Sequence, residues 1–144
     1  MNTRVRIFGV GLLSILCLTM AFAQSGAQQP PLTVKEIMNT MIVPTTTTIW
    51  GAYQLETDAQ WQEVRNAALS VIAAGDLLQT GGAGEGEAAK ASEADWQSYN
   101  QQMIDAARQV IAATENKDED ALSAAGNDAL YPPCESCHQQ YQSR

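Results

Sequence analysis

The sequence predicts an all-α protein, an antiparallel four-helix bundle, on three observations. Apolar residues recur at spacings of three and four in four separate segments, which is the period of a helix with one buried face. No stretch of useful length alternates apolar and polar residues, as a half-buried strand would. The segments are joined by short links, and helices joined in this way pack as antiparallel neighbours.

The first predicted helix begins after Thr33 and ends near Gly51. Thr33 can cap it, and Glu36, three residues on, completes a capping box. Pro44 has no N–H and its ring clashes with the preceding turn, so we expect a kink or a restart there. The apolar face of this helix is formed by Val34, Ile37, Met38, Met41 and Ile42.

The second predicted helix begins at Thr57 or Asp58 and ends at about Gln79. The glycine-rich residues 80–86 follow, and no helix tolerates that composition. They lack the Lys-Ser/Thr ending of a phosphate-binding loop, and no predicted strand precedes them, so they are interpreted as a flexible connection. The apolar face of the second helix is formed by Trp61, Val64, Ala68, Val71 and Ile72.

Two further helices are predicted after this linker. Ser92 is expected to cap the third, and an acidic turn at residues 116–120 leads into the fourth. Tyr131-Pro132-Pro133 predicts a break or kink in the fourth helix, with Pro133 suited to the first turn of a new helical piece. The apolar face of the third helix holds Trp96, Tyr99, Met103, Ala106, Val110 and Ile111, and that of the fourth holds Leu122, Ala125 and Ala129. Trp50, Trp61 and Trp96 all fall on apolar faces and are predicted to be core residues.

Residues 1–23 have the pattern of a secretory signal peptide. Two arginines precede an apolar run from Ile7 to Met20, and Ala21-Phe22-Ala23 supplies the small residues for cleavage after Ala23. The run is shorter than the roughly 20 residues that span a bilayer, so a retained anchor is the weaker interpretation. We expect export to the periplasm.

The mature chain is predicted to consist of a disordered leader, residues 24–32, and one folded domain, residues 33–144. Cleavage removes two of the eight basic residues and none of the sixteen acidic ones, so the net charge changes from −8 to −10. No cluster of lysine or arginine remains, and nucleic acid is therefore not expected as a partner. An acidic surface would steer positively charged partners at low salt.

The chemistry is carried by Cys134-Glu135-Ser136-Cys137-His138. On a helix, positions i, i+3 and i+4 point to one side, so both thiols and the imidazole can face one flat ligand. In a c-type haem the thiols add across two vinyl groups as thioethers, and the imidazole binds the iron. The mature chain has no other cysteine, and two so close together cannot staple a fold. The motif predicts one covalent haem c.

Other chemistries compete for the same residues. A thioredoxin-like redox pair would need a β-α-β context, which the pattern lacks. A structural zinc site needs four ligands, whereas the mature chain has two cysteines and one histidine. An exported disulfide or metal module without haem is the remaining alternative. No Ser/His/Asp set can be built around the single histidine, so we do not expect an enzyme.

A helical chain with its only Cys-x-x-Cys-His near the C-terminus resembles the cytochrome c′ family, the class II c-type cytochromes (c′/c-556 type). The resemblance covers the layout of roughly the whole mature chain. It implies a haem bound near the C-terminal helix of the bundle, and a homodimer through the first two helices. Two features depart from the family pattern: residues 131–133 interrupt the haem-bearing helix, and Gln142 stands where a basic residue often follows the aromatic. The specific residues of the resemblance are Cys134, Cys137, His138 and Tyr141.

The second axial position of the iron decides the function. His138 is the only histidine, so this position is either open or filled by methionine. In the family it is faced by the first helix, which here carries Met38, our first candidate, and Met41, our second; Met103 is a weaker one, and each is also explained by core packing. Methionine ligation suits single-electron transfer between redox proteins, which is the function we expect. An open position suits binding of nitric oxide or carbon monoxide, the alternative.

Overall fold

The computed structural model describes residues 31–142, and this part of the chain is helical and contains no strand. The all-α prediction is confirmed. The predicted signal peptide, with cleavage after Ala23, lies outside the described residues, as does most of the predicted leader. None of the helices within residues 31–142 combines the length and the apolar character that crossing a membrane requires. The elements are α1 (Val34–Ile37), η1 (Met38–Ile42), α2 (Val43–Trp50), α3 (Asp58–Leu78), α4 (Glu87–Ala91), α5 (Ala94–Asn116), α6 (Glu119–Ala124), η2 (Ala125–Leu130) and α7 (Tyr131–Tyr141), where η marks a π-helical turn.

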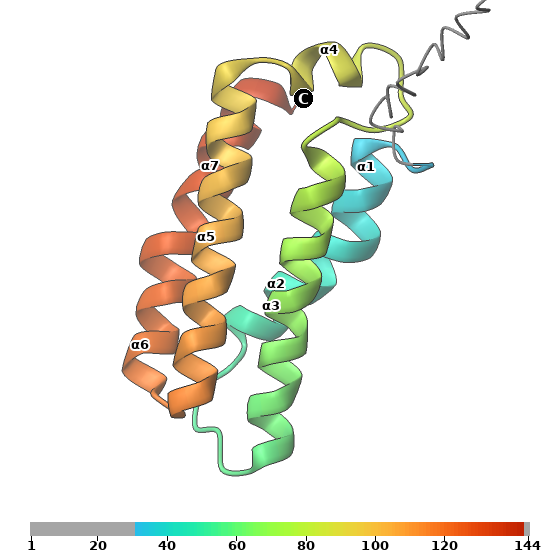
Figure 1. Cartoon of the computed structure of the whole chain (residues 1–144). Coiled ribbons are helices and arrows are strands. Elements are labelled where there is room, and N and C mark those ends of the chain that lie inside the picture. Colours follow the sequence, from blue (N-terminus) through green and yellow to red (C-terminus); the bar gives the residue numbers. More distant parts are fainter. Residues whose placement is uncertain (1–30, 143–144) are drawn as a thin grey trace, which may run out of the picture.

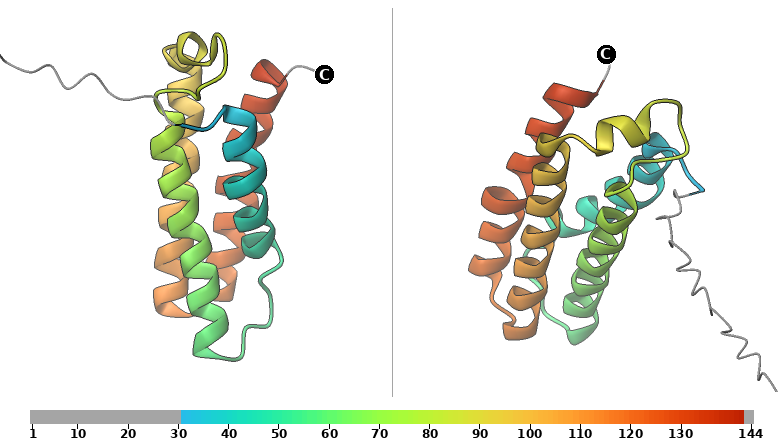
Figure 2. Two further views of the ribbon diagram at one scale, coloured as in Figure 1. Left: turned by 90° about the vertical axis from the view of Figure 1, so that its right-hand side faces the viewer. Right: turned by 45° about the horizontal axis from the view of Figure 1, so that its top comes forward.

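Several of these elements join into longer helical stretches. α1, η1 and α2 form one stretch, and α6, η2 and α7 form another (Figure 1). These two stretches lie side by side with α3 and α5, and the chain reverses direction from each to the next. α3 packs most extensively against α5, while α2 contacts α3 and α7 contacts α5. Figure 2 shows the short α4 crossing the end of the molecule where α7 finishes.

Capping boxes start α1 and α3. The box at α1 was predicted, whereas for the second helix only the start at Thr57 or Asp58 was. Thr33 Oγ1 accepts a hydrogen bond from the Glu36 amide at 3.2 Å, and the Thr33 amide donates to Glu36 Oε2 at 2.8 Å. Thr57 and Gln60 repeat the arrangement at the start of α3, with distances of 3.3 and 2.9 Å. Each box satisfies amides that the first turn of a helix leaves without a partner.

The glycine-rich linker is held against the first helix, although it was expected to be a flexible connection. Glu87 Oε2 accepts hydrogen bonds from the amides of Gly84, at 2.9 Å, and Val34, at 3.0 Å. The short α4 that follows was not predicted. The predicted cap at Ser92 is wrong, because Ser92 ends α4 and Glu93 occupies the N-cap of α5.

The proline interruptions each follow a π-helical turn, and the chain stays helical through both. η1 precedes Pro44, and η2 precedes the prolines at 132–133. The Val43 amide bonds five residues back to the Met38 carbonyl, the mark of a π-turn. We attribute the persistence of the helix to this wider turn, which makes room for a ring that would clash in a regular helix. At Pro44, where a kink or restart was predicted, the helix therefore continues through a local widening. Pro133 lies in the first turn of α7, as predicted.

The core lies mainly between α3 and α5 and confirms most of the predicted apolar faces. Trp61 and Trp96 are both 6% exposed. The core prediction for Trp50 is wrong, since this side chain is 43% exposed. Its indole donates to the Gly126 carbonyl at 2.9 Å, and its ring meets Tyr131 edge-on. Trp50 therefore covers the η2 turn from outside. The fully buried large side chains are Ile37, Leu78, Ile104, Leu130, Val71 and Val110.

Gly75 sets the close approach of α3 and α5. A Cβ at this position would lie 2.5 Å from Ile104 Cγ1, and Ile104 is itself buried. We expect Gly75→Ala to lower the free energy of unfolding by about 1–3 kcal/mol, the usual cost of overpacking, in urea denaturation of the mature protein. Gly126→Ala is the control, because its Cβ would meet only an ordinary contact at 3.4 Å from Trp50. Equal stability of the two variants would contradict the close approach.

Candidate functional site

The three predicted site residues come together on α7. Cys134, Cys137 and His138 line one cavity between α7 and α5. Both cysteines are free thiols and partly buried, whereas His138, which lines the same cavity, is exposed. The spacing of three and four residues that suggested a shared side is therefore realised in the helix.

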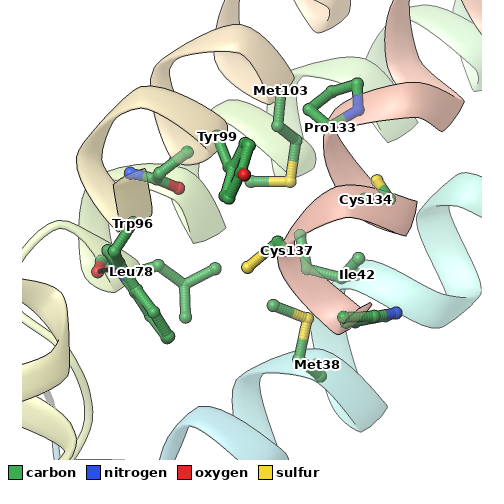
Figure 3. A pocket seen from close by; sticks show the side chains of 11 residues that line it. Met38, Ile42, Leu78, Trp96, Tyr99, Met103, Pro133, Cys134 and Cys137 are labelled. Carbon is green, nitrogen blue, oxygen red and sulfur yellow. Dashed lines mark hydrogen bonds between the residues drawn. The ribbon is translucent and has the colours of Figure 1, made fainter. Parts of the chain in front are cut away.

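The rest of the cavity wall is largely apolar and comes from other helices. The cavity has a volume of about 40 Å³. Figure 3 shows Cys137 pointing from α7 toward Leu78 and Trp96, with the thioether of Met38 close by. The other lining residues are Met38 and Ile42 of η1, Leu78 of α3, Trp96, Tyr99, Asn100 and Met103 of α5, and Pro133 of α7.

A larger groove adjoins this cavity. The groove has a volume of about 470 Å³, within the range of about 300–1,000 Å³ that small-molecule and cofactor sites occupy. Its rim carries charged side chains, Lys35, Glu87 and Lys90. The two spaces share Met38, Trp96, Cys137 and His138. The cavity is thus lined mainly by apolar side chains, and the adjoining groove adds three charged ones.

The structure separates the two methionine candidates. Met38 lines both the cavity and the groove, whereas Met41 lines neither and packs half-buried against the core. Both lie in η1, and its wider turn changes the angle between them around the helix axis from that of a regular α-helix. Met103 lines the cavity from α5 and is 6% exposed. Which sulfur, if any, binds a metal stays a prediction.

Both thiols are weaker acids than a solvent-exposed cysteine. Burial, with a smaller contribution from Cys137, raises the pKa of Cys134 to about 11, and burial also raises the pKa of Cys137. Both therefore stay protonated near neutral pH. A redox-active Cys-x-x-Cys pair instead needs a thiolate with a lowered pKa. This environment argues against the thioredoxin-like alternative.

Within residues 31–142, no group of three or more histidine, cysteine, aspartate or glutamate side chains is placed to hold a metal ion. Two free thiols and a neighbouring imidazole that line one largely apolar cavity fit a haem, which the two sulfurs would hold as thioethers and the imidazole nitrogen would bind at the iron.

Tyr141 fastens the end of α7 to α5. Its hydroxyl donates to Glu93 at 2.9 Å, and its ring packs edge-on against Trp96 with centroids 5.1 Å apart. Partial burial, and then the contact with Glu93, raise the pKa of Tyr141 to about 12. The phenol therefore remains a neutral donor, and the contact holds the last turn of α7 beside the cavity.

The sequence prediction missed Asn100 and Leu78 as lining residues. Asn100 follows Trp96 by four residues and precedes Met103 by three, so it lies on the predicted apolar face of its helix. A polar residue at such a position was the available signal. Leu78 offered no such signal in the sequence, because its position opposite α7 depends on tertiary packing.

No family model, no curated protein and no solved structure matches this chain. The resemblance to the cytochrome c′ family therefore depends on the Cys-x-x-Cys-His motif and on the layout of the chain.

Proposed function

We propose that this chain is a periplasmic monohaem c-type cytochrome that transfers single electrons between redox proteins. In this proposal residues 33–144 form an antiparallel four-helix bundle with the haem bound near its C-terminal helix. The observation that carries it is the placement of Cys134, Cys137 and His138 on one side of α7, against an apolar cavity. When bound, haem supplies a one-electron ferrous–ferric couple.

Each side chain of the site has a role in this proposal. Cys134 and Cys137 would hold the porphyrin as thioethers, and His138 would bind the iron from one face. Leu78 and Trp96 exclude water from the inner side, and Trp96 is fixed by an indole hydrogen bond to the Leu78 carbonyl at 2.8 Å. A fixed apolar wall limits rearrangement when the charge of the site changes. The exposed His138 marks the side where a partner could approach.

Electrochemistry of the mature protein, produced alongside the c-type maturation machinery, tests this function. We expect one reversible one-electron wave and electron exchange with a second redox protein. A haem-loaded protein that exchanges no electrons but binds carbon monoxide stoichiometrically in the ferrous state would favour the alternative, a gas-binding protein. The mostly apolar cavity wall is the observation that supports this second candidate.

Met38 is the methionine that would supply a thioether to the iron, because it lines both the cavity and the groove. We expect Met38→Ala to convert a low-spin ferric spectrum to a high-spin one and to lower the reduction potential, since a thioether ligand favours the ferrous state. Absorption spectra and potentiometric titration measure the two changes. Met41→Ala is the matched control and should leave both unchanged. The reverse result would make Met41 the ligand.

A further inference from the structure

One buried polar atom of the cavity has no hydrogen-bond partner in the described part of the chain. It is Oδ1 of Asn100, a residue that is 7% exposed. The other end of the same amide is engaged, since Nδ2 donates to the Gly75 carbonyl at 2.9 Å. A carbonyl can only accept, so this bond fixes which end of the amide is the nitrogen. Oδ1 is the end left over.

Asn100 belongs to the wall that faces the thiols. It lines the cavity shared by Cys134 and Cys137. The two neighbouring aromatic side chains on α5 do not donate a hydrogen bond to Oδ1, because each donates its polar hydrogen to another partner. The Trp96 indole donates to the Leu78 carbonyl at 2.8 Å, and the Tyr99 hydroxyl donates to Gln140 at 3.3 Å.

A buried acceptor without a donor is costly and uncommon in native proteins. The bond to Gly75 accounts for the amide nitrogen of Asn100 but not for its buried oxygen. The polar oxygen therefore points to an interaction with whatever the cavity holds. A carbonyl oxygen carries partial negative charge, and its field is strong where water is excluded.

We propose that Asn100 tunes the reduction potential of the bound haem by presenting Oδ1 to it. This inference rests on the proposed function. The ferric haem carries one more positive charge than the ferrous haem, so a nearby partial negative charge stabilises the ferric state. Oδ1 acts directly or through a water molecule that donates to it, and in both cases it lowers the potential.

The test is the midpoint potential of the haem-loaded Asn100→Leu protein, measured by spectroelectrochemical titration. Removal of the acceptor should shift the ferrous-to-ferric ratio at a fixed electrode potential about tenfold toward ferrous, in proportion to one lost hydrogen-bond-sized interaction. For a one-electron couple this is a rise of about 59 mV. Asn100→Val should shift the potential in the same direction, and it provides a second test if the leucine variant folds poorly.

Thr114→Val is the matched control. Thr114 is a buried polar residue of the same helix, 5% exposed, and its hydroxyl donates to the Ile111 carbonyl at 2.7 Å, away from the cavity. The midpoint potential of the haem-loaded Thr114→Val protein should equal that of the parent protein. A potential that is unchanged or lowered in the haem-loaded Asn100 variants would overturn this inference and leave the proposed function intact. Absence of haem from the parent protein would overturn both.

Discussion

Replacing both Cys134 and Cys137 with alanine is expected to abolish covalent haem attachment completely. Each thioether needs its own sulfur, and the mature chain is predicted to hold no third cysteine. Denaturation and extraction with acidified organic solvent should then remove all colour from the protein. The parent protein should keep its haem under the same treatment.

Ser136→Ala is the control for this experiment, because Ser136 lies between the two cysteines without lining the cavity. It should retain the full haem content. Each single cysteine variant should keep at most one thioether, with an absorption band shifted toward that of a haem that retains one vinyl group. Haem that survives denaturation in the double variant would show that these thiols are not the attachment points.

Replacing His138 with alanine is expected to have the second-largest effect. No other histidine exists in the sequence to take over the axial position. The variant should therefore lose the imidazole-bound spectrum of the parent in both oxidation states, and its reduction potential should change. Because His138 also lines the open groove, added imidazole should reach the site and restore the spectrum.

Gln139→Ala, one residue further on, is the matched control, since this exposed side chain bonds within α7, to Glu135 at 3.3 Å. It should keep the parent spectrum without added imidazole. If His138→Ala retains that spectrum as well, the iron is held by another side chain and the assignment of His138 is wrong.

Much of the fold could be predicted because its signals are local. The capping pairs Thr33–Glu36 and Thr57–Gln60 are three residues apart, and their hydrogen bonds need no other part of the chain. The π-turns could not be predicted in the same way. The sequence shows Pro44 as an interruption, but whether a helix breaks or widens there depends on the packing of both flanking segments. The exposure of Trp50 depends on its contact with η2, 76 residues away in the chain.

The candidate site shows the same difference between local signals, which the sequence reveals, and long-range contacts, which it does not. The spacing of Cys134, Cys137 and His138 is enough to predict that they share one side of a helix. Met38 and Met41 could be distinguished only once the π-turn η1 was known, because on a regular helix both would share one face. The unpartnered Oδ1 of Asn100 could be recognised only from the contact of this side chain with Gly75 on α3. Contacts between helices distant in sequence leave only weak signals in a single sequence.

The intact mass of the purified mature protein, made alongside the c-type maturation machinery and measured under denaturing conditions, tests the central claim most directly. The proposal predicts the mass of the chain without residues 1–23 plus that of one haem, together with an alkaline pyridine spectrum typical of two thioethers. The mass of the polypeptide alone, from a colourless preparation, would contradict it.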